Sequence, residues 1–163
     1  MHCKRLCFLA LLSIIFIFPV SSSMVCFLVV ETGLSEDVPL SRFSSLWEGG
    51  LMDVFFDAGH IVTNCPITRL GKKPASDLGE LLEDDYADAV EGGAEYFILC
   101  YLEHQENSAT AIPISMNIKV FRTDTDEKIL DKVFSAGRGR NQNEEYQLAQ
   151  NAGRDIIPII RDW

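Results

Sequence analysis

The stretch that decides the fold is Gly93-Ala94-Glu95-Tyr96-Phe97-Ile98-Leu99-Cys100-Tyr101-Leu102, which leads from two glycines into the strongest strand signal in the chain. Residues 96–102 are all apolar or aromatic, with no polar residue alternating between them. Such a short, unbroken run is typical of a strand that is covered on both faces. We therefore expect residues 95–103 to form the central strand of a sheet.

Other strands are expected on both sides of this segment. Residues 24–30 form a second short apolar run and predict another strand buried on both faces. Residues 60–67 predict a strand in which Pro66 indicates an edge position or an end. Apolar and polar residues alternate over 112–120, which predicts a strand with one buried and one wetter face. The residues expected on the buried face are Ile112, Ile114, Met116, Ile118 and Val120, and those opposite are Ser115, Asn117 and Lys119. After a polar turn at 123–126, residues 129–135 predict the last strand.

Three segments have helical periodicity. The first follows a capping-box pattern, Ser45-Leu46-Trp47-Glu48, and should end at Gly59. Its internal Gly49-Gly50 pair is unfavourable in a helix unless the helix packs closely on a neighbouring backbone. The second should begin at Ser76 or Asp77 and end at Gly92-Gly93. Its expected apolar stripe comprises Leu78, Leu81, Leu82, Tyr86, Ala89 and Val90.

The third helix should begin at Asn141 or Asn143 and run to about residue 160, with Pro158 loosening its last turn. The expected order is β-α-β-α-β-β-β-α. We therefore predict an α/β fold with a single mixed sheet of about five strands flanked by three helices.

The N-terminus has the pattern of a secretory signal. Lys4 and Arg5 precede the uncharged apolar run 6–20, and three serines at 21–23 provide the small residues of a cleavage site. We expect residues 1–23 to be a signal peptide and 24–163 to be one domain. Because residues 24–30 prolong the hydrophobicity, an uncleaved membrane anchor is an alternative. A lipoprotein is less favoured, since Val25 precedes Cys26 where a small residue is needed.

The charge of the chain restricts its partners. The sequence has 24 acidic and 14 basic residues, a formal net charge of −10. Removing residues 1–23 would take away two of the basic residues. A domain this acidic is poorly suited to nucleic acid or anionic lipid. The arginines in the loop 137–140 do not change this expectation, and membrane contact is expected only if the N-terminal segment stays uncleaved.

Three cysteines remain after the expected cleavage: Cys26, Cys65 and Cys100. Two of them lie inside apolar runs, where a thiol behaves as a small hydrophobic group. Three buried thiols are the favoured interpretation, and one disulfide with one free thiol is the alternative. No Cys or His spacing indicates zinc.

The Gly93-Ala94-Glu95-Tyr96 turn, the hairpin expected over 118–134 and the closing helix over 144–160 together resemble a group of bacterial envelope domains. The group includes the amino-terminal domain of TolB, the curli secretion protein CsgG, and lipoprotein activators of penicillin-binding proteins. The resemblance implies a periplasmic module that works by binding other proteins. Self-assembly, as in the curli relatives, is left open.

Two groups of residues could carry chemistry. Asp53, Asp57 and His60 have spacings that align them on one side of a helix, where they could bind a divalent metal or act as acid and base. A solvated helix face is the competing interpretation, because Gly59 should end the helix before His60. Glu31, Glu103 and His104 follow two strands whose ends would meet if the strands are parallel neighbours. Ordinary polar strand ends are the competing interpretation there.

No catalytic or cofactor motif is present, so we predict a non-enzymatic, exported protein-binding module, periplasmic or envelope-associated, without a cofactor. Its partners should be envelope proteins or a second copy of the chain. The alternative is a small metal-binding protein or metal-dependent hydrolase. The candidate partner-binding surface is the acidic side of the second helix, together with the exposed face and edge of the expected meander. The acidic residues of the helix are Glu80, Glu83, Asp84, Asp85 and Asp88. Phe56, off the main apolar stripe, could add to a partner-facing patch.

Overall fold

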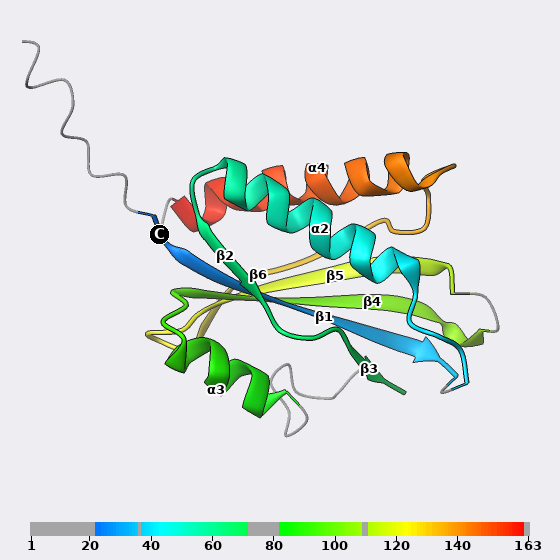
Figure 1. Cartoon of the computed structure of the whole chain (residues 1–163), viewed down its shortest axis with the longest axis horizontal. Helices are drawn as coiled ribbons and strands as arrows, with labels where there is room; N and C mark the ends of the chain where they lie inside the picture. The colour runs from blue at the N-terminus through cyan, green and yellow to red at the C-terminus, as the bar shows by residue number, and fades with distance from the viewer. Residues whose placement is uncertain (1–21, 36, 72–81, 109–110, 162–163) are drawn as a thin grey trace, which may run out of the picture.

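The computed structural model describes residues 22–35, 37–71, 82–108 and 111–161. Within these ranges, six strands form one sheet: β1 (Met24–Leu34), β2 (Ile61–Asn64), β3 (Thr68–Leu70), β4 (Tyr96–Ser108), β5 (Pro113–Arg122) and β6 (Glu127–Phe134). Three helices accompany them: α2 (Arg42–Asp57), α3 (Glu83–Glu91) and α4 (Gln142–Arg161). The predicted α/β fold with one mixed sheet and three helices is confirmed (Figure 1).

The sheet has the order β2-β1-β4-β5-β6, and β3 also pairs with β1. β1 runs parallel to β2, β3 and β4, whereas β4, β5 and β6 form an antiparallel meander. The strand expected over 60–67 is shorter, ending at Asn64, and after residues 65–67 the chain forms a further short strand, β3, that the sequence did not predict. Pro66 lies in this interruption, where its missing N–H is not needed for pairing. The central position predicted for the strand over 95–103 is confirmed.

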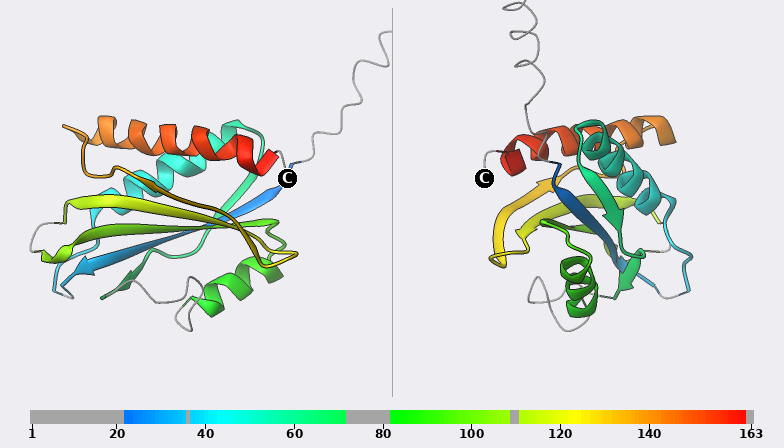
Figure 2. Two further views of the ribbon diagram at one scale, coloured as in Figure 1. Left: turned by 180° about the vertical axis from the view of Figure 1, so that it is seen from behind. Right: turned by 60° about the vertical axis from the view of Figure 1, so that its left-hand side comes forward.

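The helices cover the two faces of the sheet unequally. α2 and α4 lie side by side on one face, and the shorter α3 lies on the other (Figures 1 and 2). The larger core lies under α2 and α4 and includes Phe27, Trp47, Phe55, Ile98 and Ile156. The smaller core lies on the α3 side and includes Leu28, Leu82, Phe97 and Phe121.

A close contact between α2 and α4 accounts for the glycine pair inside α2. A Cβ placed on Gly50 would lie 2.7 Å from the Cβ of Ala149 and 2.9 Å from the carbonyl oxygen of Tyr146. A Cβ on Gly49 would meet only the ring of Tyr146, at 3.6 Å. Gly50 is therefore the member of the pair that the packing requires.

Helix boundaries differ from the sequence prediction in part. The capping-box prediction is wrong: α2 begins at Arg42, and Ser41 is its N-cap, with a side chain that accepts a hydrogen bond from the amide of Phe43. Glu48 accepts instead from the side chain of Asn64. The end at Gly59, with φ 92°, is as predicted. Asn141 caps α4 by accepting from the amide of Glu144.

Two predictions about faces were wrong at the start of β5. Ile112 and Ile114 are exposed, although Met116, Ile118 and Val120 are buried as expected. Pairing with β4 skips one residue there, since Glu103 faces Ser115 whereas His104 faces Pro113, and the bulge takes Ile114 out of the alternation. Val90 on α3 is likewise exposed.

The face of β5 that was expected to be wetter is in fact buried at Asn117 and Lys119. Asn117 and Lys119 are both almost inaccessible to solvent. They are tolerated there because Asp131 of β6 accepts a hydrogen bond from Asn117 at 2.9 Å and lies 3.7 Å from the ammonium of Lys119.

Two predictions concern residues outside the described ranges. The expected signal peptide, residues 1–23, falls almost wholly there, as does the expected start of the second helix at Ser76 or Asp77. Within the described residues this helix begins later than predicted, at Glu83, and Leu82 is its non-helical N-cap. Among the described helices, none combines the length and the apolar character that crossing a membrane would require.

Candidate functional site

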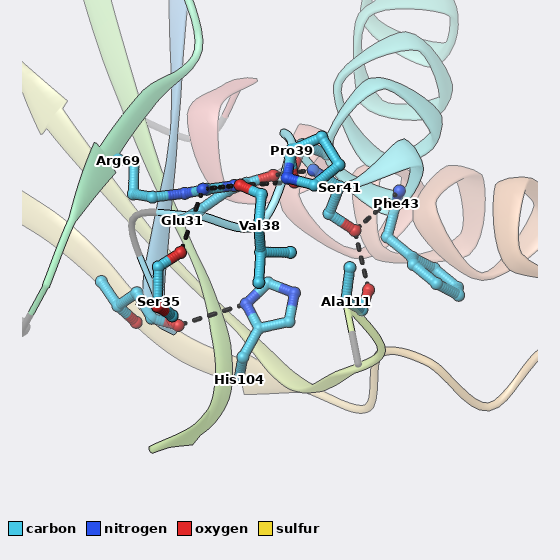
Figure 3. A network of polar contacts seen from close by, with 11 residues as sticks. Glu31, Ser35, Val38, Pro39, Ser41, Phe43, Arg69, His104 and Ala111 are labelled. Atoms are coloured by element: carbon cyan, nitrogen blue, oxygen red, sulfur yellow. Dashed lines mark hydrogen bonds and ion pairs between the residues drawn. The ribbon is translucent and has the colours of Figure 1, made fainter. Parts of the chain in front are cut away.

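The polar residues that were expected to follow the first and third strands lie inside β1 and β4, toward the carboxyl ends of the strands, and they meet because the two strands are parallel neighbours. Thr32 is paired with Glu103, and Glu31 with Leu102. His104 reaches across through its Nδ1 atom, 3.1 Å from the carbonyl oxygen of Thr32. The predicted neighbourhood is therefore present, and its contacts are shown in Figure 3.

Glu31 is the centre of this network and is fully buried. Its Oε1 atom accepts hydrogen bonds from the amide of Ser41, at 2.6 Å, and from the hydroxyl of Ser44. Its Oε2 atom accepts two from the guanidinium of Arg69, from Nε at 3.1 Å and from Nη2 at 2.5 Å. The carboxylate also lies at the N-terminus of α2, where a negative charge is favourable.

Arg69 extends the network to the loop between β1 and α2. Its guanidinium donates to the carbonyl oxygen of Ser35 at 3.4 Å, to that of Pro39 at 3.0 Å, and to that of Val38 (Figure 3). The hydroxyl of Ser41 in turn donates to the carbonyl of Ala111, at 2.8 Å. β3, this loop and the start of α2 are thus held together by one buried ion pair.

This arrangement is suited to holding the fold together more than to acid–base chemistry. Four donors occupy the Glu31 carboxylate, so it is fixed as an acceptor. Glu103 has a separate partner, since the hydroxyl of Ser115 donates to it at 2.7 Å. Burial lowers the pKa of His104, and its Nε2 atom is buried without a hydrogen-bond partner among the described residues. Glu31, Glu103 and His104 are close in the sheet but do not converge on one reacting position.

The second predicted group, Asp53, Asp57 and His60, is not brought together. Asp53 accepts a hydrogen bond from the hydroxyl of Tyr146 on α4. His60 is buried, with Nδ1 2.7 Å from the hydroxyl of Ser23 and its ring against Phe55. Asp57 is exposed at the end of α2. Within the described ranges, no group of three or more acidic, Cys or His residues is placed to hold a metal ion.

The acidic helix α3 is the third candidate. Glu83, Asp84 and Asp88 are exposed and Asp85 is half-buried, while Glu80 lies outside the described residues. Partial burial, followed by repulsion from Asp88 and Asp84, raises the pKa of Asp85 above its usual range. This surface therefore concentrates negative charge, and repulsion between its carboxylates contributes to the raised pKa of Asp85.

The structure adds the turn between β5 and β6 to this surface. The hydroxyl of Tyr86 on α3 donates to the carboxylate of Asp126 at 2.6 Å. Burial first, and then that hydrogen bond and the charges of Asp126 and Asp124, raise the pKa of Tyr86. The sequence shows the acidic turn, but only the fold places it beside α3. We call Glu83, Asp84, Asp85, Asp88 and Asp126 the acidic surface.

Comparison with known proteins gives a family and a set of solved structures. The family model that matches, over residues 24–161, carries the description "Uncharacterised protein". No curated protein matches the sequence. A PelC dodecamer from Paraburkholderia phytofirmans matches with a TM-score of 0.51 and 11% identity, over 85% of this chain and 89% of that chain.

Two other solved structures are similar over most of this chain. Lipoprotein GNA1162 from Neisseria meningitidis is 9% identical, with a TM-score of 0.44 over 83% of this chain and 99% of that one. TolB from Acinetobacter baumannii is 12% identical, with a TM-score of 0.39 over 86% of this chain and 27% of that one. TolB is one of the proteins named in the resemblance stated from the sequence. At these identities the likeness concerns the fold alone.

Proposed function

The chain belongs to this family of uncharacterised proteins, and we propose that it is an exported, non-enzymatic module that binds another protein of the cell envelope through its acidic surface. The observation that carries the proposal is the clustering of Glu83, Asp84, Asp85 and Asp88 on the nine-residue helix α3, with Asp126 beside them. The similarity in fold to PelC, GNA1162 and TolB supports an envelope setting.

The chemistry of the acidic surface defines the kind of partner. Like charges this close repel one another, which is a cost to the folded state that a cationic partner would relieve. The raised pKa of Asp85 has the same origin in part. A partner should therefore present Lys and Arg side chains, and its capture should weaken as salt screens the attraction.

Self-assembly is compatible with this proposal. PelC is a dodecamer, which supports testing whether this chain also forms a closed oligomer. A second copy would be an acidic partner, however, so it is expected to meet this chain through another face. Light scattering during size-exclusion chromatography would give the number of copies.

Charge reversal tests the acidic surface directly. Asp84 and Asp88 are exposed and four residues apart, so they lie on one side of α3. Replacing both with Lys should reduce cross-linked partner recovered from the envelope fraction of the native cells by about tenfold or more, the equivalent of roughly 1.4 kcal/mol. Asp57 and Asp155, exposed on α2 and α4, provide a control with the same change in charge.

The outcomes separate binding from general electrostatics. The proposal predicts loss of capture for the Asp84→Lys/Asp88→Lys variant and wild-type capture for the Asp57→Lys/Asp155→Lys control, with both variants folded by circular dichroism. Equal capture by all three proteins would reject the acidic surface. Equal loss in both variants would show that net charge, and not this surface, governs the interaction.

A further inference from the structure

Cys26 and Cys65 are the pair of nucleophilic side chains that the proposed function leaves unused. Cys26 lies in β1, and Cys65 is the first residue after β2, the strand that pairs with β1. Their sulfur atoms are 3.7 Å apart, and both are thiols. Cys100 is buried in the core on the other face of the sheet, away from this pair.

The pair lies beside an open hollow of about 330 Å³. The hollow is lined by β1 and the β2–β3 connection and by Asp85 and Asp88 of α3. The Cys65 sulfur is 3.8 Å from the carbonyl oxygen of Asp85, which places α3 directly against it. A small molecule can therefore approach the two sulfur atoms, although each side chain is mostly covered.

We propose that Cys26 and Cys65 are a redox pair, which exchange with a donor disulfide converts into a disulfide joining β1 to the β2–β3 connection. The proposal does not rest on the proposed function, because it can be tested on the purified protein. Closure requires the sulfur atoms to approach from 3.7 Å to about 2.05 Å. Cys65 lies in the link between β2 and β3, where its amide donates a hydrogen bond to the carbonyl oxygen of Phe27 in β1 at 2.8 Å, so the approach should come mainly from rotation of the two side chains.

The order of the two exchange steps follows from the environment of each thiol. A hydrogen bond from Cys65 lowers the pKa of Cys26 to about 7, which makes Cys26 the attacking thiolate. That same hydrogen bond, burial, and the negative charges of Cys26, Asp85 and Asp88 raise the pKa of Cys65.

Atoms and electrons balance over the two steps. Cys26 attacks the donor disulfide, forms a mixed disulfide and releases one donor thiol. Cys65 then loses its proton to solvent and attacks the Cys26 sulfur, which releases the second donor thiol. The two protein thiols together lose two electrons and two protons, and the donor disulfide gains both.

The test uses the full-length chain with Cys3 and Cys7 replaced by Ser, because Cys7 would otherwise lie on the same tryptic peptide as Cys26. The protein is reduced and then equilibrated natively with mixtures of reduced and oxidised glutathione. Remaining thiols are alkylated, and the protein is digested with trypsin. Cleavage after Arg42 and Arg69 puts Cys26, Cys65 and Cys100 on three separate peptides. The expected product is a peptide pair joined through Cys26 and Cys65, 2 Da lighter than the two thiol peptides together, with Cys100 still alkylated. A matched run in denaturant should lose this preference for the pair.

Variants make the result decisive. Cys100→Ala should leave the cross-link unchanged, whereas Cys65→Ser should abolish it and leave Cys26 as a thiol or a glutathione adduct. Circular dichroism of Cys65→Ser shows whether the fold is retained, and Cys26→Ser provides the reciprocal test. Full alkylation of both thiols after equilibration with oxidised glutathione would overturn the proposal, as would a cross-link that involves Cys100.

Discussion

Removing the guanidinium of Arg69 should destabilise the protein far more than breaking an exposed ion pair. In Arg69→Met, an apolar side chain of similar length replaces the partner of the fully buried Glu31. The carboxylate would keep only the amide of Ser41 and the hydroxyl of Ser44 as donors. The carbonyl oxygens of the loop at 35–39 would lose their common donor at the same time.

The magnitude follows from the burial of the two partners. Breaking a buried ion pair by removing one member typically costs about 3–5 kcal/mol, because it leaves an uncompensated charge. Arg69 retains 16% side-chain exposure, which allows some relief by water and favours the lower end of that range. We expect a loss of about 3 kcal/mol, a large part of the roughly 5–15 kcal/mol by which domains are stable.

Urea denaturation followed by circular dichroism measures this loss as a lower midpoint at an unchanged slope. Lys132→Met is the matched control, since its partner Asp155 is 60% exposed and the pair should be worth about 1 kcal/mol or less. If Arg69→Met cost no more than Lys132→Met, the Glu31–Arg69 pair would not be what holds β3 and the loop to the start of α2.

Two further perturbations test packing and pH dependence. Gly50→Ala should cost about 1–3 kcal/mol because its Cβ would collide with Ala149 of α4, whereas Gly49→Ala, next to the movable ring of Tyr146, should be neutral or stabilising by up to about 1 kcal/mol. Equal effects in urea denaturation would contradict the close α2–α4 contact. Burial lowers the pKa of His104 below its ordinary 6.5, so the unfolded chain binds a proton first as pH falls and stability is lost below about pH 6.5. Between pH 7.5 and 5.5, His104→Gln should therefore lose less stability than the wild type, and parallel losses would count against this role of His104.

Much of the fold could be predicted because the strongest signals in the sequence are local. The apolar runs at 24–30 and 96–102 identify two neighbouring buried strands, β1 and β4. Gly59 and Asn141 mark helix ends because their roles depend only on nearby backbone groups. Which residues of a strand face the core was harder to predict, because a single bulge opposite Glu103 is enough to expose Ile114.

The partners of buried polar groups could not be predicted, because they come from distant parts of the chain. Asp131 offsets the cost of burying Lys119 and Asn117, but the sequence around these two residues does not indicate that Asp131 is their partner. Glu145 is buried because Trp47 and the amides of Gly137 and Gly139 donate to it. A charged residue at the end of an apolar strand, Glu31, was a visible signal, but its partner Arg69 was not.

The most direct test of an exported envelope module is the intact mass of the chain in fractionated native cells. We expect the protein to be recovered from the periplasmic or envelope fraction with the mass of residues 24–163 and no added lipid. Full-length mass in the membrane fraction would show an uncleaved anchor at the N-terminus. Full-length protein confined to the cytoplasm would contradict the proposed function, since an envelope partner could not then be reached.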